Sequence, residues 1–320
     1  MPAETPTTRA RRLLGSRWVR AAAVAVVLAC LGWAVAGQWR VISAAEWNLD
    51  PPRFALATVV LALSFAIVAW LWGIALAAMG GVPVRRGARI WFLSNLARYV
   101  PGSVWSILGA VELARRDGAS RKQAAAVVAL TQLLSVGVAL LAGLPVLIAE
   151  RDRLGAPVAA GLAVVVVLLA ALWLLRHRLA GLLRRRYPDL TVADLVPPPG
   201  LAVRLVIGYA VYWIVAGLAF GLFAASVYPP AAGELPLAIA AFGAAYAVGF
   251  LSLLTPSGLG VREGILVLVL SGVMPAGVAA VVAVGARAWM MAVELLGAAV
   301  TVALAGRGPA SPGQRSGPGP

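Results

Sequence analysis

Long apolar runs, separated by short basic or charge-balanced segments, dominate the chain. Runs such as "LAVVVVLLAALWLL" at 162–175 show no alternation of polar and apolar positions, which disfavours a membrane β-barrel. Apolar stretches of about 20 residues have the length that a helix needs to cross a bilayer. They predict an all-α polytopic membrane protein with complete spans over 18–38, 54–80, 123–149, 157–175, 201–227 and 277–305.

Two further apolar segments are interrupted by Pro and Gly. The first has arms at 90–100 and 103–114 on either side of Pro101-Gly102, and basic flanks at 85–89 and 115–122. Both arms are too short to span, so we expect a re-entrant element that enters from the cytoplasm. The second has arms at 236–252 and 263–273 around a break at 254–262.

The topology of the second segment has two readings. If 236–273 is also re-entrant, it enters from outside, the two elements are an inverted pair, and both termini are cytoplasmic. If 236–252 spans fully, the count becomes eight crossing helices and the C-terminus lies outside. The sequence leaves both readings open.

Turn and capping signals set several boundaries. Gly80-Gly81 ends the second span, and Asp117-Gly118 ends the second arm of the first broken element. Ser120 and Gln123 form a capping box that starts the span at 123. The sequence "MPAG" at 274–277 turns the chain into the last helix.

The domain organisation is simple. Residues 1–17 predict a basic cytoplasmic arm, 18–305 a single integral membrane domain, and 306–320 a disordered tail rich in Pro and Gly. The apolar run at 21–37 is long for a signal-peptide core, so we expect an uncleaved first helix. Basic clusters beside apolar runs favour a cytoplasmic N-terminus in the plasma membrane.

Composition narrows the function further. The chain of 320 residues is 62% hydrophobic and carries a net charge of +15, but its basic residues flank predicted spans, so we expect no nucleic-acid partner. A single cysteine, Cys30, and a single histidine, His177, exclude an internal disulfide, a His/Cys metal site and a Cys–His nucleophile. With no nucleotide-binding loop either, we expect no cofactor and no metal.

The Pro and Gly interruptions of the two broken segments indicate a binding site for an anion. Irregular backbone at membrane depth is tolerated where it is buried in protein or lines a wet cavity. Helix starts at Pro101-Gly102-Ser103 and Pro256-Ser257-Gly258 would each offer free N–H groups to an anion. Because a guanidinium at mid-bilayer costs roughly 2.5–3.5 kcal/mol, intramembrane arginines need a partner, water or a ligand. Their planar fork of donors suits a phosphate.

The sequence therefore predicts a cavity that binds a lipid phosphate. Its expected lining residues are Arg98, Pro101, Gly102, Ser103, Glu112, Pro256, Ser257, Gly258, Gly260, Arg262, Glu263, Arg287 and Glu294.

Each charged candidate also has a purely structural reading. Arg98 could extend to the cytoplasmic interface, and Glu112 could pair with Arg115 or Arg116 on its own helix. Arg262 and Glu263 could form an interfacial cap. Arg287 and Glu294, seven residues apart on one helix face, could be an ion pair that only fixes packing.

Two spaced motifs carry a resemblance. "NLARYVPGSVWSILGAVELARRDGAS" at 95–120, followed by "LTPSGLGVREG" and "GARAWMMAVELLG", resembles the flippase-like transmembrane domain of lysylphosphatidylglycerol synthases. The pattern maps onto Arg98, Pro101, Gly102, Glu112, Pro256, Gly258, Gly260, Arg262, Glu263 and Arg287. The resemblance implies translocation or handling of an anionic lipid. Only about fifteen polar residues follow the last helix, so we carry over no lipid-aminoacylating activity from the bifunctional members.

The leading hypothesis is thus a flippase-like protein of envelope lipid biogenesis, moving an anionic phospholipid or polyprenyl-linked lipid. One alternative is an integral-membrane glycosyltransferase that uses a lipid-linked sugar. Its acidic candidates, Glu46 and Asp50 in the first outer loop, form no tight pair. Another is a non-catalytic partner subunit of such a system. Expected partners are membrane lipids and an envelope glycosyltransferase or lipid-synthesis enzyme.

Overall fold

The computed structural model describes residues 48–96, 104–150, 197–229, 235–251 and 260–305. Within these ranges the chain folds into α-helices without strands. The helices are α4 (Pro51–Gly80), α5 (Val84–Asn95), α6 (Val104–Arg116), α7 (Arg121–Ala149), α9 (Pro199–Val227), α10 (Leu235–Leu251), α11 (Val261–Leu270) and α12 (Ala276–Ala305). The predicted all-α class is confirmed.

Four helices, α4, α7, α9 and α12, are long and apolar enough to cross a membrane. Their bounds lie within three residues of the predicted spans. α4 begins three residues before the predicted position, because the Asp50 side chain caps the helix by accepting from Arg53 N and Pro51-Pro52 occupy its first turn. The predicted spans at 18–38 and 157–175 fall outside the described residues.

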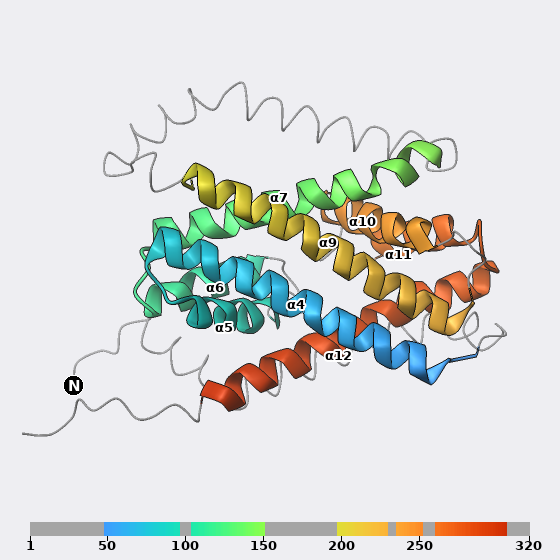
Figure 1. The fold of residues 1–320 in the computed structure, drawn as a ribbon, viewed down its shortest axis with the longest axis horizontal. Coiled ribbons are helices and arrows are strands. Elements are labelled where there is room, and N and C mark those ends of the chain that lie inside the picture. Colours follow the sequence, from blue (N-terminus) through green and yellow to red (C-terminus); the bar gives the residue numbers. More distant parts are fainter. Residues whose placement is uncertain (1–47, 97–103, 151–196, 230–234, 252–259, 306–320) are drawn as a thin grey trace, which may run out of the picture.

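The long helices run in both directions between two ends of the bundle (Figure 1). At one end lie the C-terminal ends of α4 and α12 and the starts of α7 and α9. We call it the basic end, because it carries the arginines of α5 and of the α6–α7 connection, namely Arg85, Arg86, Arg89, Arg115, Arg116 and Arg121. At the far end lie the starts of α4 and α12 and the ends of α7 and α9.

Helices α10 and α11 form a hairpin that belongs to the far end. α10 runs antiparallel to α9: Leu235 contacts Gly221 and Ile239 contacts Gly217, both in the second half of α9. α11 then runs back along α10, with Arg262 beside Gly249. The start of α10 and the end of α11 therefore face the same end of the bundle (Figure 1). This is the geometry of the re-entrant reading, which returns the chain through α12 to the basic end.

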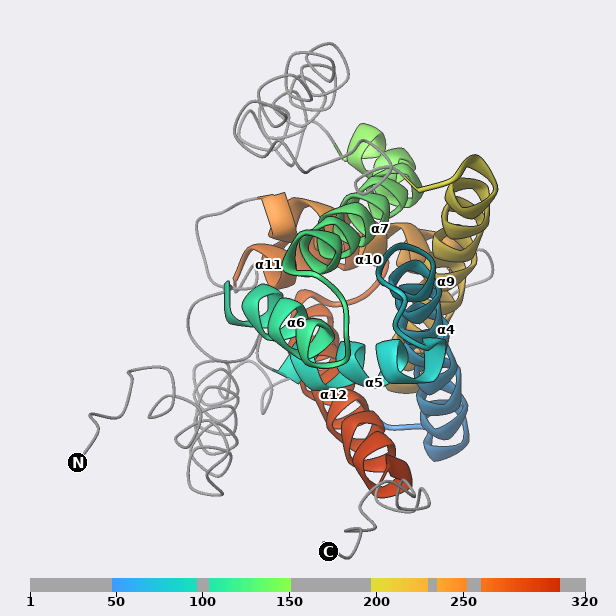
Figure 2. The same ribbon diagram turned by 90° about the vertical axis from the view of Figure 1, so that its left-hand side faces the viewer.

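Helices α5 and α6 form the opposite hairpin, seen nearest the viewer in Figure 2. The predicted first arm, 90–100, begins six residues too late, and its last residues, 97–100, lie outside the described residues. The basic flank at 85–89, which was placed outside the arms, belongs to the first half of α5, and this helix ends at Asn95. The reason is packing: Gly87 and Ile90 are buried, and Gly87 lies so close to Gly73 of α4 that an added Cβ would be 2.7 Å from its Cα.

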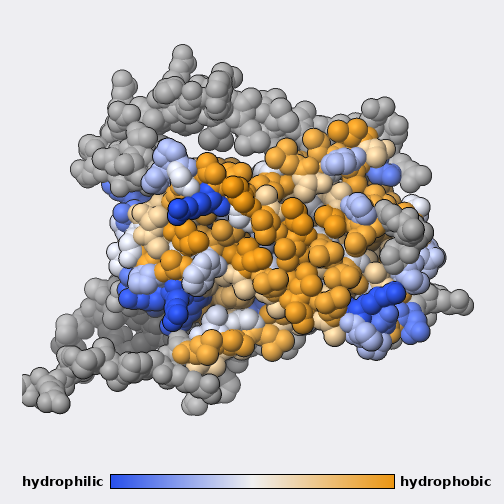
Figure 3. Space-filling model, in the orientation of Figure 1, coloured by the Kyte–Doolittle hydropathy of each residue, from blue (hydrophilic) through white to orange (hydrophobic). Residues whose placement is uncertain are grey.

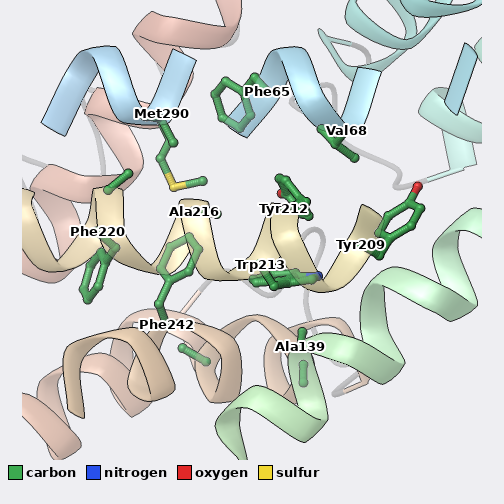
Figure 4. Packing of buried hydrophobic residues seen from close by; sticks show 14 of the residues in the cluster. Phe65, Val68, Ala139, Tyr209, Tyr212, Trp213, Ala216, Phe220, Phe242 and Met290 are labelled. Carbon is green, nitrogen blue, oxygen red and sulfur yellow. The ribbon is translucent and has the colours of Figure 1, made fainter. Parts of the chain in front are cut away.

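Aromatic side chains of α9 fill the centre of the bundle. Trp213 lies 4.7 Å from Tyr246 and 5.9 Å from Phe242, measured between ring centroids, and Phe220 stacks on Phe242 at 5.0 Å (Figure 4). These contacts join α9 to α10. Small residues allow the close approach of α10 and α7, where Gly143 lies against the backbone of Ala244.

The outer face of α4 and α9 is apolar. Large side chains that are exposed along it are Leu56, Val59, Leu63 and Trp70 on α4, and Val203, Val206, Ile207, Val211 and Ile214 on α9. In Figure 3 this face of the molecule is largely hydrophobic, with polar residues towards both ends. An apolar surface of this extent is what a helical protein turns towards lipid.

Candidate functional site

An ion pair joins the second hairpin to the last helix. Arg287 Nη1, near the middle of α12, donates to Glu263 Oε1 in the first turn of α11 at 2.7 Å. The two side chains are 21% and 17% exposed, so the pair is largely withdrawn from solvent. The sequence predicted both residues for one site. The pairing across two helices was not predicted, because a separation of 24 residues leaves no local signal.

The second oxygen of Glu263 caps its own helix. Gly260 adopts a left-handed φ of 83° and donates its N–H to Glu263 Oε2 at 2.8 Å. Glycine suits this position because it tolerates positive φ. Glu263 therefore supplies the carboxylate half of a capping box, as expected for an acidic residue at the third helical position. The structure thus shows Glu263 both capping its own helix and pairing with Arg287.

Arg262 faces two other helices. Its guanidinium lies 4.9 Å from the ring centroid of Phe242 in α10, and its Nη2 lies 3.3 Å from Met290 Sδ in α12. A cation over an aromatic face gains about 0.5–2 kcal/mol, depending on its desolvation. Neither Phe242 nor Met290 was among the predicted site residues. Met290 was within reach of sequence reasoning, since it lies three positions after Arg287 on the same face of α12.

Glu294 completes this face of α12. Its side chain is only 2% exposed, although a glutamate carboxylate is normally ionised in water. It lies seven residues after Arg287 in α12. Its predicted partner was Arg287, and the structure gives that arginine a contact to Glu263 on α11.

Glu112 occupies a separate place on α6. Its carboxylate accepts from Arg115 Nε and Nη2 at 3.0 Å, and from Arg116 Nε at 3.2 Å. The structural reading of Glu112 is thus the one observed. The hydrogen bonds from Arg115, opposed by partial burial and assisted by Arg116, lower the pKa of Glu112 from 4.5 to about 2. Its side chain is 36% exposed, so solvent screens much of this interaction.

The remaining predicted site residues lie outside the described residues. They are Arg98, Pro101, Gly102, Ser103, Pro256, Ser257 and Gly258. Of those that are described, the structure brings together Gly260, Arg262, Glu263 and Arg287 where α10, α11 and α12 meet. The predicted capping box of Ser120 and Gln123 is confirmed at 3.0 and 3.2 Å, and it starts α7 at the basic end.

The arrangement has the chemistry of an ion-binding site. Among the described residues, no group of three His, Cys, Asp or Glu side chains could hold a metal ion. What the junction offers is two guanidinium groups, one carboxylate and the N-terminus of a half-length helix. Such groups recognise charged head groups or ions by charge and hydrogen bonding.

Long apolar helices, two hairpins of short helices inserted from opposite ends, and ionic side chains inside the bundle define a polytopic membrane protein. Residues 20–297 match the family model described as "Lysylphosphatidylglycerol synthase TM region". The chain therefore belongs to this family, as its two motifs indicated. No curated protein matches the chain.

Proposed function

We propose that the protein binds the phosphate-bearing head group of an anionic lipid between α11 and α12 and carries it across the bilayer. The lipid is a phospholipid or a polyprenyl-phosphate-linked lipid of the cell envelope. The family suggests lipid handling by its described name, and the intramembrane ion pair supplies the chemistry.

The ion pair of Arg287 and Glu263 is the observation that carries the proposal. A purely structural helix contact at this depth needs no charge, and charged residues inside membrane bundles mark ligand or ion pathways. The pair lies at the first turn of α11, a helix of ten residues that is too short to span. Half-helices of this kind, inserted from opposite ends, hold the substrate site in many transporters.

The distribution of basic residues supports one orientation of the protein in the membrane. Arg85, Arg86 and Arg89 are exposed on α5, and Arg115 and Arg116 lie close to the next connection. By the positive-inside rule, the basic end faces the cytoplasm. We further propose that the protein lies in the plasma membrane with its N-terminus in the cytoplasm. We also propose that it acts beside an envelope glycosyltransferase or a lipid-synthesis enzyme.

Reconstitution tests the proposal. The purified protein is placed in phosphatidylcholine vesicles with a trace of fluorescent phosphatidylglycerol, and dithionite quenching reports the fraction of label that reaches the outer leaflet. A second arm uses a fluorescent polyprenyl-phosphate lipid. We expect wild-type protein to exchange one of these lipids between leaflets, and Arg98→Ala and Arg262→Ala to slow the exchange at least tenfold.

Arg204→Ala is the matched control. Arg204 is exposed near the start of α9, and we expect the variant to behave as wild type. If wild-type vesicles exchange neither lipid faster than protein-free vesicles, the proposed translocation is wrong.

A further inference from the structure

We propose that Glu263 is the resident counter-anion of this site, and that a lipid head group binds by exchange with the Glu263 carboxylate. The inference rests on the proposed function and deepens it. It assigns a specific event, the release of Glu263 from Arg287, to the binding of the anionic ligand.

The geometry places one carboxylate on two kinds of anion donor. Glu263 Oε1 accepts from the Arg287 guanidinium at 2.7 Å, and Oε2 accepts from the Gly260 N–H at 2.8 Å. These are a planar cation and a backbone donor at a helix start, the groups that phosphate uses in proteins. The carboxylate thus already occupies positions that an incoming phosphate oxygen would take.

The charge balance points the same way. The described ionic residues that meet at the junction, Arg262, Arg287 and Glu263, have a formal net charge of +1. The Glu263 carboxylate therefore cancels the charge of one of the two guanidinium groups. When Glu263 leaves Arg287, the guanidinium regains its full attraction for a phosphate, and the anionic ligand restores the balance.

Exchange also has a mechanical consequence. The bond from Arg287 to Glu263 ties the first turn of α11 to the middle of α12. A head group that takes over Arg287 therefore loosens the hairpin of α10 and α11 from α12. Ligand binding and hairpin release become one event, which is what a carrier needs if it is to move only when loaded.

Glu263→Gln separates the charge from the cap. A glutamine at the third helical position still accepts the Gly260 N–H through its side-chain carbonyl, so the start of α11 is preserved. The variant removes only the ionic competition for Arg287. Binding is measured by isothermal titration calorimetry on the full-length protein in a neutral detergent. The probes are dihexanoyl-phosphatidylglycerol, dihexanoyl-phosphatidylcholine and inorganic phosphate.

We expect Glu263→Gln to bind dihexanoyl-phosphatidylglycerol roughly tenfold more tightly than wild type, the effect of removing one partly exposed ion pair. Arg287→Gln should abolish this gain in the double variant. Phosphatidylcholine should show no gain. A gain for inorganic phosphate as well assigns recognition to the phosphate group alone; a gain confined to the lipid assigns it to the head group together with its glycerol and acyl chains.

A second measurement serves if Glu263→Gln does not fold. Spin labels at Gly264→Cys in α11 and Ala292→Cys in α12, in a Cys30→Ser background, report the separation of the two helices. Gly264 has open space around its Cβ position, and Ala292 is exposed. Adding dihexanoyl-phosphatidylglycerol should lengthen or broaden the distance distribution, and phosphatidylcholine should leave it unchanged.

Different results would overturn the exchange and the proposed function. If wild type binds phosphatidylglycerol, Arg287→Gln weakens it, and Glu263→Gln binds no tighter, the exchange is wrong and the proposed function stands. An unchanged spin-label distance on phosphatidylglycerol binding would likewise overturn the exchange. If neither wild type nor Glu263→Gln binds any of the anionic probes, the proposed binding function fails, and the exchange fails with it.

Discussion

Gly143 of α7 lies directly against the backbone of Ala244 in α10. A Cβ added to Gly143 would collide with the Ala244 N and would lie 2.5 Å from its Cα, distances that real side chains do not adopt. The reverse contact is similar, because a Cβ on Gly243 would lie 2.8 Å from the carbonyl oxygen of Ala139. These two glycines thus determine how closely the hairpin of α10 and α11 packs against α7.

Gly143→Ala is therefore expected to lower the free energy of unfolding by about 1–3 kcal/mol, the usual cost of overpacking. The control is Gly137→Ala in the same helix, where nothing lies within 4 Å of the added Cβ. Thermal unfolding in detergent should show a lower Tm for Gly143→Ala and an unchanged or higher Tm for Gly137→Ala. Equal Tm values for the two variants would contradict the close contact.

A hydrogen bond from Trp289 to Thr58 joins α12 to α4. Its indole N–H donates to Thr58 Oγ1 at 2.9 Å, and Thr58 in turn donates to the Phe54 carbonyl oxygen at 2.8 Å. Trp289→Phe removes this donor and keeps an aromatic ring against Phe223. We expect Trp289→Phe to lower the free energy of unfolding by about 1 kcal/mol, the net contribution of one hydrogen bond.

A double-mutant cycle with Thr58→Val checks the assignment. The effects of Trp289→Phe and Thr58→Val should be less than additive in Tm, because both remove the same bond. Trp70→Phe on the exposed face of α4 provides the matched control and should leave the Tm close to wild type. Strict additivity would show that the two side chains do not interact.

The carboxylate of Glu112 gives a pH dependence with a definite sign. Its pKa in the folded protein is about 2, below the usual value of 4.5, because Arg115 and Arg116 hydrogen-bond to the charged form. The stabilisation is therefore present above about pH 4.5 and is lost as the pH falls towards 2. Since the side chain is 36% exposed, we expect it to contribute less than about 1 kcal/mol.

Glu112→Gln should thus be slightly less stable than wild type at pH 6, and the difference in Tm should disappear as the pH approaches 2. The measurement is the Tm of both proteins across this range. Asp117→Asn, which removes an acidic residue from the same end of the bundle, controls for general charge effects. A difference that persists at pH 2 would mean that Glu112 acts by packing and not by charge.

The exposed arginines of α5 should attract anionic lipid to the basic end. A basic side chain near an anionic surface contributes about 1 kcal/mol, and salt screens this attraction. The combined substitution of Arg85, Arg86 and Arg89 by Gln should lower the amount of phosphatidylglycerol that co-purifies with the protein from mixed-lipid nanodiscs. Arg53→Gln at the far end should not. An enrichment that is insensitive both to the triple change and to salt would argue against this surface.

Most of the fold could be predicted from hydropathy. The spans that became α4, α7, α9 and α12, and the short arms α10 and α11, follow from apolar length together with Pro and Gly breaks. The error at α5 has a physical source. The segment "VRRGAR" looks like a loop because of its charge, yet Gly87 and the following Ile90 let one face pack on α4 while the arginines stay exposed. A span-length criterion does not detect an amphipathic helix of this kind.

The sequence singled out the charged residues that meet where α11 packs on α12, but it did not predict their contacts. Arg262, Glu263 and Arg287 were conspicuous because each charge interrupts an apolar run. Their partners depend on how α11 is seated on α10 and α12. The cation–π contact of Arg262 uses Phe242, which lies in an apolar stretch and has no distinguishing sequence signal.

The two hairpins lie towards opposite ends of the bundle. Since α5 and α6 return to the basic end and α10 and α11 return to the far end, each end has its own pair of short helices. Either pair can be altered without shortening a helix that crosses the whole membrane. A change confined to one hairpin therefore alters one end of the bundle, and the two ends can be compared in this protein by paired variants, one in each hairpin.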